Sequence, residues 1–130
     1  MEEQKRKSDL EERTEKFSLR VRNFCLRLKR DIINAEYIRQ LVRAAGSVAG
    51  NYIEANENPG DADLRFRVRV CRKESKESRL WLRHILTYND PVLEKERLEL
   101  IEEATELEKI FAAILRKLME KGGNASRRNK

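Results

Sequence analysis

Apolar residues recur along four stretches of the chain at alternating steps of three and four residues. This spacing places them on one face of an α-helix, so each stretch predicts an amphipathic helix with a single core-facing seam. The predicted seams are Leu10, Thr14, Phe17, Val21, Phe24 and Leu28; Ile38, Leu41, Ala45, Val48, Tyr52 and Ala55; Leu64, Val68, Cys71, Ser75, Ser78, Leu82 and Ile85; and Leu100 or Ile101, Ala104, Leu107, Phe111, Ile114 and Leu118.

Polar residues ahead of the first two seams predict where those helices begin. Ser8 is followed three positions later by Glu11, as in a capping box, so the first helix is predicted to start at Ser8 or Asp9. Asn34 is a favoured N-cap residue, and the second helix is predicted to begin after it.

Loop residues predict the bounds of the third and fourth helices. Residues 56–63, NENPGDAD, read as the central loop, with Asp61 or Asp63 as the cap of the third helix. Pro91 suits the first position of the fourth helix, where its missing amide hydrogen does no harm. The Gly122–Gly123 pair is predicted to end that helix.

Four helices joined by short connections predict an all-α fold, an antiparallel up-down-up-down four-helix bundle. Residues 64–71, LRFRVRVC, also alternate as a strand would. A strand needs a partner, whereas the helical seam continues to Ile85, so we favour the helix. The predicted layout is a flexible N-terminus at 1–8, the bundle domain at 9–121 and a disordered basic tail at 122–130.

Two features lie off the core and predict a neighbour. Gly46 and Gly50 would each cost a helix about 1 kcal/mol relative to Ala, and close approach of a neighbouring helix or a second subunit would explain them. Phe66, Val70 and Trp81 form a second apolar face on the third helix. We therefore predict a homo-oligomer whose interface contains these three residues.

The charge of the chain is unevenly distributed. Its 130 residues carry 29 Lys and Arg against 23 Asp and Glu, a net charge of +6, and residues 16–30 and 65–73 are basic without any acid. Such runs are either solvated helix faces or a surface for RNA or DNA, and the composition does not separate the two. For the second case, the predicted phosphate contacts are Arg20, Arg27, Arg65, Arg69 and Arg72.

The sequence predicts a cytoplasmic protein. Cys25 and Cys71 lie on or beside apolar seams and are too few for a disulfide framework, so we expect reduced thiols. The first residues contain no apolar signal region, and no run approaches 18 apolar residues, so neither secretion nor a membrane partner is expected.

No motif predicts catalysis, a cofactor or a metal. His84 is the only histidine and has no metal-ligand spacing with Cys, Asp or Glu, and no Glu-x-x-His pair of a di-iron bundle is present. Phosphate-binding loop motifs are absent, and Ser47, Ser75 and Ser78 have no base near them in sequence. We therefore expect a protein that is not an enzyme.

Several polar residues beside the seams predict structural pairing. Asn51 and Glu54 adjoin the second seam and would need hydrogen-bond partners, such as Arg or Lys from the third helix. Glu74 and Glu77, the carboxylates within residues 73–78 (KESKES), are predicted to pair with Arg43 or Arg39 of the second helix.

Two segments of the chain resemble a known bacterial family. RAAGSVAGNYIEA, residues 43–55, and KESKESRLWLRHI, residues 73–85, are similar to the rRNA intervening-sequence proteins, and the resemblance extends from Phe17 to the EKIFAAILRKL segment at 108–118. Members are four-helix bundles encoded within insertions in large-subunit rRNA genes or as free-standing genes. In fold and charge the chain also resembles the accessory variability protein of diversity-generating retroelements, a basic pentameric barrel that binds a reverse transcriptase and nucleic acid.

The resemblance implies a homopentamer with a role linked to nucleic acid. Two functions then stay open: a non-enzymatic scaffold that binds RNA or other nucleic acid through basic helix faces, and a protein-interaction scaffold that docks an enzyme such as a retroelement reverse transcriptase. For the first, about five phosphate contacts to a single strand predict a log-log salt slope near −3.5.

Overall fold

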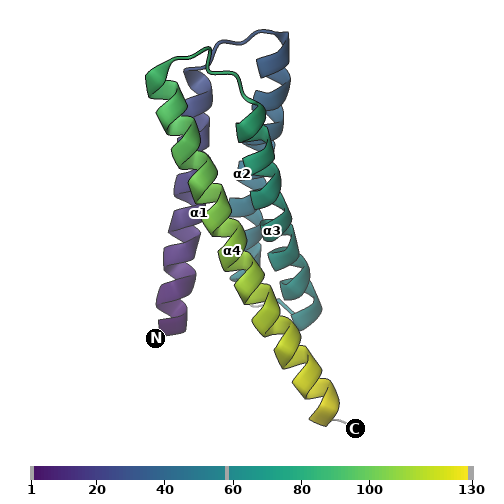
Figure 1. Cartoon of the computed structure of the whole chain (residues 1–130). Helices are drawn as coiled ribbons and strands as arrows, with labels where there is room; N and C mark the ends of the chain where they lie inside the picture. The colour runs from purple at the N-terminus through teal and green to yellow at the C-terminus, as the bar shows by residue number, and fades with distance from the viewer. Residues whose placement is uncertain (1, 58, 129–130) are drawn as a thin grey trace.

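The computed structural model describes residues 2–57 and 59–128, with the backbone alone at residue 3 and residues 123–128. Its elements are four α-helices, and the described residues contain no strand. The helices are α1 (Glu2–Leu26), α2 (Ile32–Ala55), α3 (Asp61–His84) and α4 (Pro91–Arg128). Each helix packs against two others, in the pairs α1–α2, α2–α3, α3–α4 and α1–α4 (Figure 1). The predicted four-helix bundle is therefore confirmed.

The ends of α1 and α4 lie beyond the predicted bounds. Residues 2–7 are strong helix formers with acids and bases four apart, so α1 begins at Glu2 rather than at Ser8 or Asp9. Likewise α4 continues through Gly122 to Arg128, because two glycines in an exposed helix weaken it by only about 1 kcal/mol each. The predicted tail at 122–130 is thus helical as far as residue 128, and residues 129–130 lie outside the described part.

Asn34 is not the N-cap of α2, which was the prediction. Asp31 is the cap, and its carboxylate accepts a hydrogen bond of 2.8 Å from the backbone N–H of Asn34. The Asn34 side chain is fully buried and joins the two loops at one end of the bundle. Its amide donates to the carbonyl oxygens of Lys29 and Leu86, and its Oδ1 accepts from the Leu86 N–H, each at 2.9 Å.

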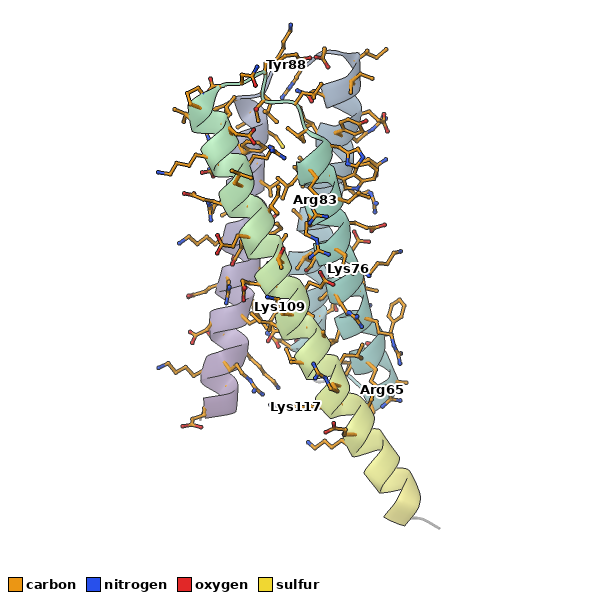
Figure 2. The ribbon with its side chains drawn as sticks, in the orientation of Figure 1. Arg65, Lys76, Arg83, Tyr88, Lys109 and Lys117 are labelled. Atoms are coloured by element: carbon orange, nitrogen blue, oxygen red, sulfur yellow. The ribbon has the colours of Figure 1, made fainter. Side chains whose placement is uncertain are left out.

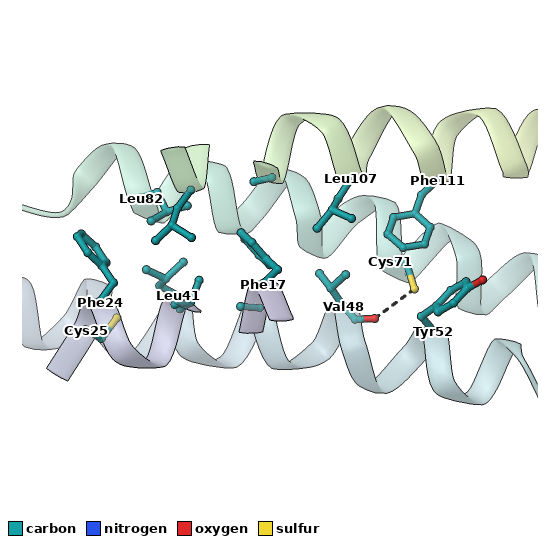
Figure 3. Packing of buried hydrophobic residues seen from close by; sticks show 14 of the residues in the cluster. Phe17, Phe24, Cys25, Leu41, Val48, Tyr52, Cys71, Leu82, Leu107 and Phe111 are labelled. Carbon is teal, nitrogen blue, oxygen red and sulfur yellow. Dashed lines mark hydrogen bonds between the residues drawn. The ribbon is translucent and has the colours of Figure 1, made fainter. Parts of the chain in front are cut away.

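The predicted seams form the core. Almost every seam residue is buried, and the remaining four, near the ends of the seams, are half-buried against it. Figure 3 shows Phe17, Leu107 and Phe111 packed between the helices, and Cys71 Sγ lies 3.5 Å from the Val48 carbonyl oxygen. Burial raises the pKa of the Cys25 and Cys71 thiols to about 12, so both are neutral, unreactive thiols.

The stretch that alternates like a strand is helical, as predicted. Two serines in its seam remain satisfied because Ser75 Oγ and Ser78 Oγ each donate to the carbonyl oxygen four residues earlier, at 2.8 Å. The cap of α3 is Gly60, so Asp61 and Asp63 lie in the first turn, where their charge favours the helix N-terminus. Pro91 is the first residue of α4, as predicted.

Close packing within the chain does not explain Gly46 and Gly50. A Cβ atom added to either residue would meet no atom within 4 Å beyond its chain neighbours and the backbone of its own helix. A neighbouring helix of the same chain is therefore ruled out as their reason, and the second subunit stays a prediction. No helix in the described ranges is long and apolar enough to span a membrane.

Candidate functional site

A basic stripe runs along the whole of α3. Its members follow one another at steps of four and three residues, which brings them to one side of the helix over a length of about 27 Å. Figure 2 shows Arg65, Lys76 and Arg83 in succession along α3. The stripe consists of Arg65, Arg69, Arg72, Lys76, Arg79 and Arg83.

Most of the basic stripe is not neutralised. Arg79 forms an ion pair of 2.6 Å with Glu108 of α4, whereas none of the other five bases has a described carboxylate within 4 Å. At the opposite end, Arg69 contacts the sulfur of Met119 at 3.4 Å, and the Arg65 guanidinium lies near Gly122. The N-terminal half of the stripe, which begins with Arg65 and Arg69, thus faces small and apolar groups of α4.

An open groove lies between this half of α3 and α4. Four bases and one acid contribute to its walls, together with an apolar side chain from α4. The lining residues are Arg69, Arg72, Lys73, Lys76, Glu77 and Leu115. Its positive excess suits an anionic ligand, and its leucine adds apolar contact.

Only three of the five predicted phosphate contacts lie together. Arg65, Arg69 and Arg72 belong to the basic stripe, while Arg20 lies on α1 and forms ion pairs with Glu96 at 3.5 Å and Glu99. Arg27 follows the end of α1, exposed at the loop end of the bundle. The predicted contacts did not include Lys76, Arg79 and Arg83, which lie beyond the basic run at 65–73, although the same spacing of three and four residues continues to them.

The predicted oligomer interface occupies a different side of α3. Phe66 is 55% exposed, whereas Val70 and Trp81 are half-buried. Trp81 stacks on Tyr37 of α2, with ring centroids 6.0 Å apart, and His84 packs edge-on against both rings. We call Phe66, Val70 and Trp81, together with Tyr37 of α2, the assembly face.

Three buried polar atoms without hydrogen-bond partners lie along this face. Among the described residues they are Arg67 Nε, Glu74 Oε2 and Trp81 Nε1. A spacing of seven residues places all three on one line of α3, next to α2. Arg67 does satisfy the prediction made for Asn51, because its Nη1 donates to Asn51 Oδ1 at 2.9 Å.

Glu74 is the most unusual member of this line. Glu74 is only 5% exposed. Burial raises the pKa of its carboxyl, the neighbouring Glu77 raises that pKa further, and Arg43 and Lys73 lower it. Arg39 is not a partner, as it pairs with Glu36 on its own helix.

Within the described ranges, no three His, Cys, Asp or Glu side chains gather closely enough to hold a metal ion. His84 Nδ1 lies 2.8 Å from the Leu80 carbonyl oxygen, a contact within its own helix.

Comparison of the chain with protein-family models, characterised proteins and solved structures finds no significant match. The resemblance to the rRNA intervening-sequence proteins therefore stays a prediction.

Proposed function

We propose that this protein is a non-enzymatic, self-assembling scaffold that binds the phosphate backbone of RNA or DNA along the basic stripe of α3. The observation that carries the proposal is the density of unneutralised charge, since five of the six bases have no described carboxylate within 4 Å. Basic side chains on one side of a helix contact phosphates and do not read the edges of the nucleobases. Binding is therefore expected to be independent of nucleotide sequence.

Assembly is part of the same proposal. By their spacing along α3, the assembly face and the basic stripe lie on different sides of the helix, so copies that join through the assembly face would leave the basic stripe open to ligand. An exposed phenylalanine and two half-buried apolar side chains support a covering molecule at this face. We infer a homo-oligomer, with the pentamer as the form that the resemblance implies.

A short RNA tests the nucleic-acid part. The affinity of a labelled 10-nucleotide RNA, measured by fluorescence anisotropy between about 50 and 300 mM salt, is expected to fall with a log-log slope near −3.5 for five contacts. The double variant Arg69→Gln/Arg72→Gln should reduce the magnitude of that slope by about 1.4. Arg20→Gln is the matched control and should leave it unchanged, because Arg20 is already paired with α4. Affinity indifferent to salt would refute phosphate binding.

A second candidate is the docking of an acidic protein segment. It is favoured by the apolar atoms beside the bases, since Leu115 lines the groove and Met119 contacts Arg69. An acidic helix with apolar residues on one face, supplied by a partner enzyme such as a reverse transcriptase, would fill such a groove. Tight binding of a reverse transcriptase encoded beside the gene, blocked by Arg69→Gln/Arg72→Gln, together with no RNA binding, would favour this candidate.

A further inference from the structure

The basic stripe runs straight along α3. From Arg65 to Arg83 its members advance by steps of four and three residues in strict alternation, which averages to the turn of an α-helix and keeps the row parallel to the helix axis. Successive basic side chains are therefore about 5.4 Å apart along that axis. A straight row of evenly spaced cations suits a polyanion whose charges can be drawn out in a line.

The side of α4 that faces this row changes from acidic to apolar. Arg79 meets the Glu108 carboxylate at 2.6 Å, whereas Arg69 meets the sulfur of Met119 at 3.4 Å. Leu115 lies between these two levels and lines the groove. Leu115 is half-buried and Met119 is 50% exposed, so apolar atoms of α4 remain open to a ligand. Within the described lining, the groove thus has a basic wall from α3 and an apolar wall from α4.

A nucleic-acid single strand has two unlike edges that match these walls. Its phosphates follow one edge, and its unpaired nucleobases are free on the other. Several single bonds separate successive phosphates, so the strand can be drawn out along a straight row. A duplex keeps its nucleobases stacked inside, and each of its backbones winds away from a straight row. The apolar wall therefore has a use for a single strand and none for a duplex.

An acidic protein helix fits the two walls less well. Such a helix would have to bury an apolar seam, and the groove offers it only Leu115 and Met119 beside a wall of cations. Stable protein interfaces need a larger buried centre with apolar anchors. A single strand needs little apolar area, because phosphate contacts supply most of the affinity.

We propose that the groove between α3 and α4 binds a single strand of RNA or DNA, with its phosphates on the basic stripe and its nucleobases against Leu115 and Met119. This inference rests on the nucleic-acid binding proposed above and adds the form of the ligand and its orientation. A methionine sulfur makes favourable contacts with aromatic rings, and nucleobases provide such rings. Contacts to the faces of the rings leave the base edges unread, so the site tolerates any nucleotide sequence.

Three labelled ligands test the proposal by fluorescence anisotropy with the full chain. They are a 10-nucleotide deoxythymidine strand, an abasic deoxyribose-phosphate strand of the same length, and a DNA hairpin with a stem of 10 base pairs. The two single strands carry the same phosphates, so their log-log salt slopes should agree, while the abasic strand should bind about tenfold more weakly at every salt concentration. The hairpin should also bind more weakly than the thymidine strand.

Met119→Ala tests the apolar wall from the protein side. It should weaken binding of the thymidine strand by about two- to tenfold and leave binding of the abasic strand unchanged. Leu98→Ala is the matched control, since Leu98 is 54% exposed on the same helix about 32 Å away, and it should change neither affinity. Native helicity by circular dichroism shows that both variants are folded.

The outcomes separate this inference from the function on which it rests. Equal affinity of the thymidine and abasic strands, both falling with salt, would overturn the nucleobase contact and leave phosphate binding standing. A hairpin that binds more tightly than the thymidine strand would overturn the single-strand assignment. No binding of any of the three ligands, together with binding of an acidic amphipathic peptide, would refute the nucleic-acid function and assign the groove to a protein segment.

Discussion

Replacing Asn34 by Ala should destabilise the fold by about 3 kcal/mol. The side chain makes three hydrogen bonds of 2.9 Å to the backbone of the two loops, two as donor and one as acceptor. A typical intramolecular hydrogen bond contributes about 1 kcal/mol, and the methyl group of Ala can replace none of the three. For a chain of this size the loss corresponds to a fall in Tm of about 10 °C.

Urea unfolding followed by circular dichroism at one fixed protein concentration measures this loss, because self-assembly would make stability depend on concentration. The midpoint should fall while the slope m stays unchanged. Asn23→Ala is the matched control, since Asn23 is exposed on α1 and should change stability by less than about 0.5 kcal/mol. A loss below about 1 kcal/mol for Asn34→Ala would contradict the bridging role.

Asn34→Asp tests the direction of the hydrogen bonds. An ionised carboxylate would still accept from the Leu86 N–H, but it would face two carbonyl oxygens that now receive no proton. Its pKa in the folded state should therefore lie above the unfolded value, so stability is lost as the pH rises through the folded pKa. The variant should be least stable near neutral pH and recover toward acid, and equal stability with the wild type at pH 7 would refute this geometry.

Three further outcomes are expected. Gly46→Ala should raise the stability of the free chain by about 1 kcal/mol in thermal unfolding, because open space surrounds the added methyl group, and weakened assembly in the same variant would place Gly46 in the interface. Cys25 and Cys71 should resist a thiol reagent at pH 8 until denaturant is added, since burial holds their pKa at about 12, and rapid labelling of the folded chain would contradict their burial. Asn89→Val should cost about 1–2 kcal/mol by urea unfolding because Asn89 has a φ of 63°, a region that β-branched residues avoid, and an unchanged midpoint would argue against this loop conformation.

The helices and the core were predictable because their signal is local. A seam repeats every three or four residues within one helix, and it even includes Ser75 and Ser78, whose hydroxyls bond within the same helix. Helix ends were less predictable, since Asn34 has the residue type of an N-cap while Asp31 holds that position.

Interactions between segments that are far apart along the chain could not be predicted from the sequence. Asn34 bonds to Leu86, which lies 52 residues along the chain. Arg20 looks like a phosphate contact until α4 brings Glu96 and Glu99 against it. The spacing of Arg67, Glu74 and Trp81 is visible in the sequence, but their lack of partners depends on how α2 packs against α3. The candidate sites were thus predictable as patterns on one helix, and their state of pairing was not.

The edge between α1 and α4 has a consequence for the order in which the bundle forms. It is the least extensive of the four helix contacts, it joins the two ends of the chain, and ion pairs such as Arg13–Glu103 at 2.8 Å span it. The α2–α3 and α3–α4 pairs are joined by short loops, so their contacts form over small sequence separations and should appear early in folding. The first and last helices meet late, and the same edge should be the first to open. Hydrogen exchange should therefore be faster in α1 than in α3, and added salt should widen that difference.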